Sequence, residues 1–155
     1  MRVLGLDYGS RTVGVAISDP TGFLASPLET IKRTDEVNLK TTVRRIRTIC
    51  EENDIHLIVL GLPLRLDGSV GTSAEKALHF QHRLERDIYK VKVIMEDERL
   101  STWEAEQPMI EAGIRDRHKR KEVVDQLAAR IILQQFLDEH TQEEIEELIP
   151  DEFKL

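Results

Sequence analysis

Cysteine is almost missing from this 155-residue sequence, because Cys50 is the only one. A single cysteine cannot form an internal disulfide, which suits a reducing compartment, and we expect Cys50 to be a small core residue. The five histidines are scattered and complete no zinc-ligand set. A GxxxxGK(S/T) loop and a nucleophile elbow are also missing. Zinc sites, P-loop nucleotide binding and serine-hydrolase chemistry therefore have no basis in the sequence.

Long apolar runs are missing as well. No stretch approaches the roughly 20 apolar residues that span a bilayer, and the N-terminus has no apolar core or cleavage site of a signal peptide. The composition, 40% hydrophobic and 33% charged, is typical of a globular protein, and the length fits one domain. We expect a cytoplasmic protein with no membrane partner.

The acidic excess is confined to the C-terminal end. The chain has 29 acidic and 22 basic residues, a formal net charge of −7, but eight of the acids and only one lysine lie in residues 138–155. Removing these leaves 21 residues of each sign in the rest of the chain. We assign residues 1–138 to a folded domain and residues 139–155 to an acidic helix or tail. For this tail a role in solubility is favoured over mimicry of nucleic acid.

Positive charge is concentrated in the segment RDRHKRK, residues 115–121, which contains a single acid, Asp116. Such a cluster suits a phosphate backbone, although a solvated loop is the more common role of a basic run. We predict that this basic loop binds nucleic acid, and that Arg11, close to Asp7 in the sequence, contributes to the binding. The predicted contact residues are Arg11, Arg115, Arg117, Lys119, Arg120 and Lys121.

The order of predicted elements indicates an α/β fold. An antiparallel meander of three strands is followed by strands that return through helical crossovers, which predicts a mixed five-stranded sheet flanked by helices. Thr72 with Glu75, and Ser101 with Glu104, have the spacing of capping boxes. The predicted strands are 2–8, 12–19, 24–31, 56–63 and 89–97, and the helices are about 36–53, 72–87, 101–113 and 119–139, with a short acidic helix before Pro150.

Carboxylates stand where three predicted elements approach one end of the sheet. Asp7 ends an apolar strand, the run EDER (96–99) ends another, and Asp125 lies at the margin of an apolar helical stripe. A buried carboxylate needs a compensating cation, metal or donor. Hard cations such as Mg²⁺ prefer oxygen ligands, and a pair of them can hydrolyse a phosphodiester. These acids therefore predict a metal-dependent site for phosphate substrates.

Several assignments near this site stay open. Glu98 and Asp97 compete as the second ligand because strand alternation places them on opposite faces. Glu96 shares the face of Glu98, where it adds a cation ligand or is simply exposed. Gly9 and Gly14 give a tight turn or, as we prefer, room for a phosphate, to which the hydroxyl of Thr12 and its neighbours offer donors.

The segments LGLDYGSRTVGVAISD, LIVLGLPLRLDGS, DERLST and VDQLAARIIL resemble the YqgF, or RuvX, proteins of bacteria over roughly residues 2–137. The resemblance implies an RNase H-like fold and a metal-dependent nuclease that processes the 5′ end of precursor 16S ribosomal RNA, also described as a Holliday junction resolvase. The family's acidic triad falls by motif on Asp7, Glu98 and Asp125, and so favours Glu98 over Asp97. An acid at Glu96 departs from the family pattern.

We therefore expect a Mg²⁺- or Mn²⁺-dependent endonuclease, with Asp7, Glu98 and Asp125 as catalytic metal ligands. Its substrate would be structured RNA or branched DNA, and it would act as a monomer or weak homodimer. One alternative is an actin-like or sugar-kinase ATPase, whose phosphate hairpin also begins Asp-x-Gly, but 155 residues leave no room for the second lobe. The other is a binding module that keeps this fold without cleaving its ligand.

Overall fold

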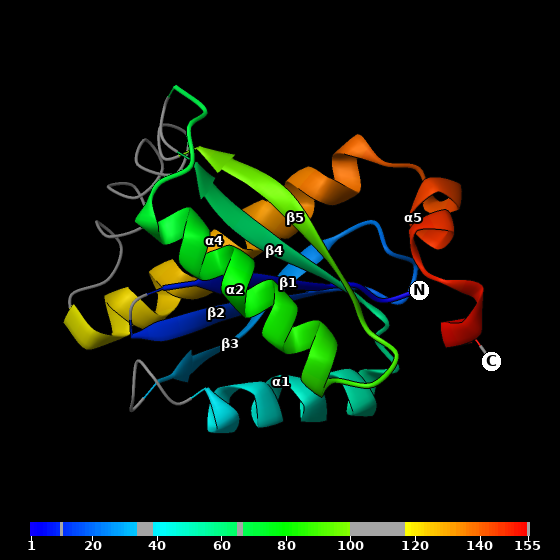
Figure 1. Ribbon diagram of the computed structural model, residues 1–155, viewed down its shortest axis with the longest axis horizontal. Helices are drawn as coiled ribbons and strands as arrows, with labels where there is room; N and C mark the ends of the chain where they lie inside the picture. The colour runs from blue at the N-terminus through cyan, green and yellow to red at the C-terminus, as the bar shows by residue number, and fades with distance from the viewer. Residues whose placement is uncertain (10, 34–38, 65–66, 100–116, 155) are drawn as a thin grey trace.

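The computed structural model describes residues 1–9, 11–33, 39–64, 67–99 and 117–154. Its centre is a mixed five-stranded sheet with strand order β3-β2-β1-β4-β5 (Figure 1). The first three strands form the antiparallel meander, β4 runs parallel to β1, and β5 runs parallel to β4, so the predicted architecture is confirmed. The strands are β1 (Leu4–Tyr8), β2 (Thr12–Ser18), β3 (Ala25–Lys32), β4 (Leu57–Leu64) and β5 (Lys92–Arg99).

Helices cover both faces of this sheet, which explains why β1 and β4 are almost continuously apolar. On one face, α1 (Lys40–Asn53) and α2 (Thr72–Asp87) enclose a core that contains Leu6, Leu60 and the buried Cys50. On the other face, α4 (Arg117–Glu139) packs on Val3, Val59 and their neighbours. No helix in the described ranges is both long enough and apolar enough to cross a membrane.

The acidic C-terminal segment is folded against the second core. It forms α5 (Gln142–Leu148) and a 3₁₀ turn, η1 (Asp151–Lys154). Ile145 and Ile149 are buried in the same cluster as Phe136 of α4. The segment therefore lies at the end of the molecule where α4 finishes (Figure 1).

Helix capping differs from the prediction. Thr72 is the first residue of α2, and its N-cap is Gly71, which has no side chain to accept a capping bond. The predicted capping box at Thr72 is therefore wrong, and that at Ser101 lies outside the described residues. A complete capping box does occur at the start of α5, where Thr141 and Glu144 bond reciprocally.

Two predicted boundaries also move. Strand β5 begins at Lys92 instead of residue 89, because Lys90 adopts a left-handed turn conformation with φ of 57°. Helix α4 begins at Arg117, two residues before the predicted start at 119, so the loop prediction is wrong for residues 117 and 118. The helix predicted at 101–113 lies outside the described residues.

Candidate active site

The carboxyl ends of β1 and β5 lie at the same edge of the sheet, because both strands run parallel to β4. Asp7 stands next to the last residue of β1, and Glu98 next to the last of β5. Asp125 is the ninth residue of α4, which crosses the sheet from this edge (Figure 1). Ligands of open α/β sheets bind at the carboxyl ends of the strands, so this edge is the candidate site.

Gly14 allows α4 to approach this edge. A Cβ atom added to Gly14 would lie 1.9 Å from the backbone oxygen of Asp125, so any side chain here would collide with the helix backbone. Gly14 pairs across the β1–β2 ladder with Asp7, and the same contact therefore brings Asp125 beside Asp7. The expectation that Gly14 leaves room for a phosphate is wrong, because the helix occupies that space.

Gly9 belongs to the turn between β1 and β2. Its N–H donates to the carbonyl of Thr12 at 2.9 Å, and an added Cβ would lie 3.1 Å from the same oxygen. The tight-turn alternative therefore describes Gly9 better than room for a phosphate.

Asp7 interacts with both of the other acids. Burial, and next the negative charge of Asp125, raise the pKa of Asp7 to about 7. Burial, and next the charge of Asp7, raise the pKa of Glu98 to about 8. Three acids in such proximity repel one another when ionised, and a bound cation would relieve that repulsion. The structure thus places Asp7 near enough to each of the other two predicted acids for their charges to interact.

Glu98 and Asp97 lie in different surroundings. The Glu98 carboxylate lies over β4, where a Cβ at Gly61 would be 2.8 Å from Glu98 Oε2 and 2.6 Å from Ile132 of α4. Glu98 therefore faces α4. This is the face on which it could share a metal with Asp7 and Asp125. Asp97 is an exposed residue on the alternate side of β5.

Thr12 positions Asp125. Its hydroxyl donates a 2.7 Å hydrogen bond to Asp125 Oδ2, between residues 113 positions apart in the sequence. The Thr12 hydroxyl therefore donates to a carboxylate and not to the phosphate predicted for it. The alternation of side chains along a strand could have predicted this contact, because it places Thr12 and Gly14 on the same face of β2, the face on which α4 packs.

Asp125 is a predicted metal ligand, and loss of a hydrogen bond that orients such a ligand typically costs about 10–100-fold. We therefore predict that Thr12→Val lowers cleavage about 10–100-fold. Thr12→Ser keeps the hydroxyl and should stay close to the parent rate. The measurement is the single-turnover cleavage rate at saturating Mg²⁺ or Mn²⁺. Equal rates for the valine and serine variants would contradict a positioning role.

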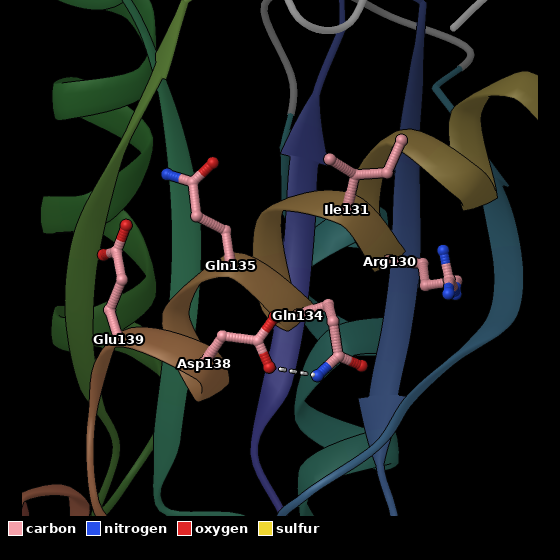
Figure 2. Close-up of a pocket in the computed structure, with 6 residues that line it drawn as sticks. All are labelled: Arg130, Ile131, Gln134, Gln135, Asp138 and Glu139. Atoms are coloured by element: carbon pink, nitrogen blue, oxygen red, sulfur yellow. Dashed lines mark hydrogen bonds between the residues drawn. The ribbon is translucent and has the colours of Figure 1, made fainter.

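Glu96 belongs to a different cluster. It is only 7% exposed, so the exposed alternative is wrong, and its Oε1 accepts a 2.8 Å bond from Gln135 Nε2. Burial, together with the nearby carboxyl of Glu139, raises the pKa of Glu96 to about 7. The adjacent surface of α4 lines a cavity with a volume of about 340 Å³. Figure 2 shows its lining residues, Arg130, Ile131, Gln134, Gln135, Asp138 and Glu139.

The predicted basic residues that the structure describes lie at the same end of the molecule. Arg11 is exposed in the turn between β1 and β2, and Lys119 is exposed in the first turn of α4. The first two turns of α4 also contain Arg117, Arg120 and Lys121. Arg117 precedes Asp125 by about 12 Å along the helix axis. Arg115 lies outside the described residues.

The three predicted ligands offer a metal only carboxylate oxygens. Within the described ranges, no three acidic, histidine or cysteine side chains form a ready-made metal-binding group. Asp7 instead forms one pair with Asp125 and another with Glu98. An all-oxygen set with few protein ligands fits Mg²⁺, which keeps several of its waters. The residues present therefore fit a hydrated Mg²⁺ or Mn²⁺ ion.

Comparison with known proteins identifies a family and a shared fold. The profile of a family described as "RuvX: Holliday junction resolvase" matches residues 1–139. A protein of Lactobacillus johnsonii named "Putative pre-16S rRNA nuclease" is 48% identical over 139 residues, covering 89% of this chain and 96% of its own. One of the same name from Clostridium tetani is 47% identical over 138 residues, with the same coverage. The structure of T. thermophilus RuvC in complex with a Holliday junction substrate shares the fold, with a TM-score of 0.50, 16% identity, and coverage of 90% of this chain and 94% of that one.

Proposed function

This chain belongs to the RuvX family, and from that we propose that it is a divalent-metal-dependent nuclease acting in 5′-end processing of precursor 16S ribosomal RNA. The relatives' names supply the substrate. The observation that carries the chemistry is the position of Asp7 at the sheet edge: its ladder partner Gly14 lies against the backbone of Asp125, and Glu98 faces the same helix.

Each part of the site has a distinct task in this proposal. Asp7, Asp125 and Glu98 would hold Mg²⁺ or Mn²⁺, which when bound supplies an activated water and charge for the leaving oxygen. Thr12 holds the Asp125 carboxylate in place. Arg11 and Lys119, exposed at the same end, would hold phosphates on either side of the cleaved bond.

A second candidate substrate is a four-way DNA junction, which the family description favours. The deciding experiment incubates the purified chain with precursor 16S rRNA and, separately, with a four-way DNA junction, each with Mg²⁺, Mn²⁺ or EDTA. We expect 5′-end cleavage of the RNA with metal and none with EDTA. Cleavage of the junction alone would select the second substrate, and cleavage in EDTA would contradict the metal mechanism.

The choice of Glu98 as ligand is tested by a matched pair of variants. We predict that Glu98→Gln lowers cleavage on the order of 100-fold or more, because it removes a charged oxygen ligand. Asp97→Asn, one residue away and exposed, should change the rate by less than about threefold. Both are measured as initial rates on the same RNA. The reverse order of effects would assign the ligand to Asp97.

Stability of the metal-free chain should fall as pH rises from about 5 to 8. The ordinary pKa values of Asp7 and Glu98 are 3.8 and 4.5, and folding raises them to about 7 and 8. Between these limits the folded chain binds more protons than the unfolded chain, so each step up in pH favours unfolding. Metal requires the ionised carboxylates, so added Mg²⁺ should stabilise more at pH 8 than at pH 5. Thermal melts in EDTA measure the pH dependence of stability, and melts in Mg²⁺ measure the stabilisation by metal at each pH. A pH profile of stability that is the same with and without Mg²⁺ would argue against a metal site at Asp7 and Glu98.

A further inference from the structure

A second cavity lies at the opposite end of the molecule from Asp7, Asp125 and Glu98. It has a volume of about 620 Å³ and lies between Met1 and Arg2, which precede β1, the end of α1 and the turn η1. Fourteen residues of α4, about 21 Å, separate Asp125 from Glu139 at the end where α5 and η1 begin. Figure 1 places the N-terminus and α5 together at this end. The cavity is therefore separate from the candidate active site.

Two cationic side chains, those of Arg2 and Lys154, line this cavity, although the chain as a whole is acidic. The acid of the lining is Asp54, and Lys154 Nζ lies 3.5 Å from the solvent-exposed carboxylate of Asp151. The Asp54 carboxylate is 94% exposed and lies 3.0 Å from His56 Nε2, while His56 Nδ1 faces the Lys90 carbonyl at 2.8 Å.

Arg2 is the residue that points to an anionic ligand. It is half-buried, and its Nη1 donates to Asn53 Oδ1 at 3.0 Å. Among the residues that the structure describes, no carboxylate pairs with Arg2. A guanidinium has five N–H donors in a fork that matches two phosphate oxygens, so one amide partner leaves most of its capacity unused. A partly desolvated cation of this kind favours a phosphate group in the cavity.

The rest of the lining suits a nucleoside. Phe153, Ile149, Pro20 and Met1 give apolar surface beside the cations. Small-molecule sites typically have this mixture of apolar walls and a few placed polar groups, in volumes of about 300–1,000 Å³. Aromatic rings beside cations are also the usual contacts of a base next to its phosphate. Ile149, Phe153 and Lys154 follow residue 139, where the family match ends, so this wall is contributed by the C-terminal segment.

We propose that this cavity binds a nucleoside 5′-phosphate, free or as the terminal nucleotide of a strand, with Arg2 and Lys154 on the phosphate and Phe153 beside the base. The site does not depend on cleavage, and nothing in it depends on the metal. The protein could then bind a nucleotide or a strand end in this cavity while the candidate active site, at the opposite end of the molecule, acts on a phosphodiester.

The test is isothermal titration calorimetry on the full chain carrying Asp7→Asn, in EDTA, so that no probe is cleaved. The probes are adenosine 5′-monophosphate, adenosine, and a short RNA with or without a 5′-phosphate. We expect the monophosphate to bind about tenfold or more tightly than adenosine, and Arg2→Gln to lose that difference, because a charged hydrogen bond contributes about 1.5–3 kcal/mol. Binding of the phosphorylated RNA but not of the free nucleotide would identify a strand end as the ligand.

Arg47→Gln is the matched control, since it removes the same charge from an exposed position on α1. Phe153→Ala removes the proposed base contact without changing charge, and thermal melts establish that each variant is folded. Arg47→Gln should bind as the parent does, and Phe153→Ala should weaken the monophosphate. The proposal is overturned if no probe binds at millimolar concentration, or if Arg2→Gln binds as Arg47→Gln does.

Discussion

Asp7→Asn is expected to lower cleavage on the order of 10³-fold or more and, at the same time, to make the metal-free chain more stable at pH 8. The loss of activity follows because Asp7 interacts with both other carboxylates and would be the shared ligand of the metal. The gain in stability follows because burial and repulsion from Asp125 disfavour the ionised form of Asp7, and asparagine carries no charge to repel. Opposite changes in activity and stability are typical of residues retained for function.

The measurements are single-turnover cleavage with Mg²⁺ or Mn²⁺ and thermal melts in EDTA at pH 5 and pH 8. Asp138→Asn is the matched control, because Asp138 is an exposed aspartate at the far end of α4. It should leave cleavage unchanged and shift stability little. An Asp7→Asn variant that still cleaves at a tenth of the parent rate would sink the proposed role. One that is inactive only because it is unfolded would show lower, not higher, thermal stability.

Gly14→Ala should destabilise the fold by about 3 kcal/mol or more, at the upper end of what overpacking costs. The added methyl would lie 1.9 Å from the Asp125 backbone oxygen, and 2.5 Å from its carbonyl carbon. Backbone atoms of a packed helix cannot move aside as a flexible side chain can. Either α4 shifts away from β2, or the chain fails to fold. A shift would move Asp125 from Asp7 and break its bond with Thr12, so folded protein should also have lost most of its cleavage activity.

Gly9→Ala is the comparison, since its added methyl would lie 3.1 Å from the Thr12 oxygen and could be relieved by a few tenths of an ångström. Urea unfolding of the two variants should give a clearly larger loss for Gly14→Ala. Hydrogen–deuterium exchange of the Gly14→Ala variant should then be faster for the backbone amides of α4 and β2. Equal stabilities for the two variants would contradict the close approach of the helix.

Local sequence patterns determined the strands of this protein and indicated its family. Alternating and continuous apolar runs predicted five strands within a few residues of their ends, because burial on one or both faces of a sheet is written into neighbouring residues. The motifs around Asp7, Glu98 and Asp125 indicated the family, and the family profile matches residues 1–139. Capping was predicted less well, since the spacing at Thr72 imitates a capping box whose N-cap position is in fact occupied by Gly71.

Contacts between distant segments were decided only by the tertiary structure. Alternation separated Asp97 from Glu98, but it could not say which face of β5 meets α4, since that depends on the packing of the helix across the sheet. The role of Gly14 and the bond from Thr12 to Asp125 also depend on where α4 lies, more than a hundred residues later in the chain. Local propensity contains no information about such a contact. It arises because the apolar stripe of α4 must bury itself against β1, β2 and β4, and glycine is the residue that lets its backbone come that close.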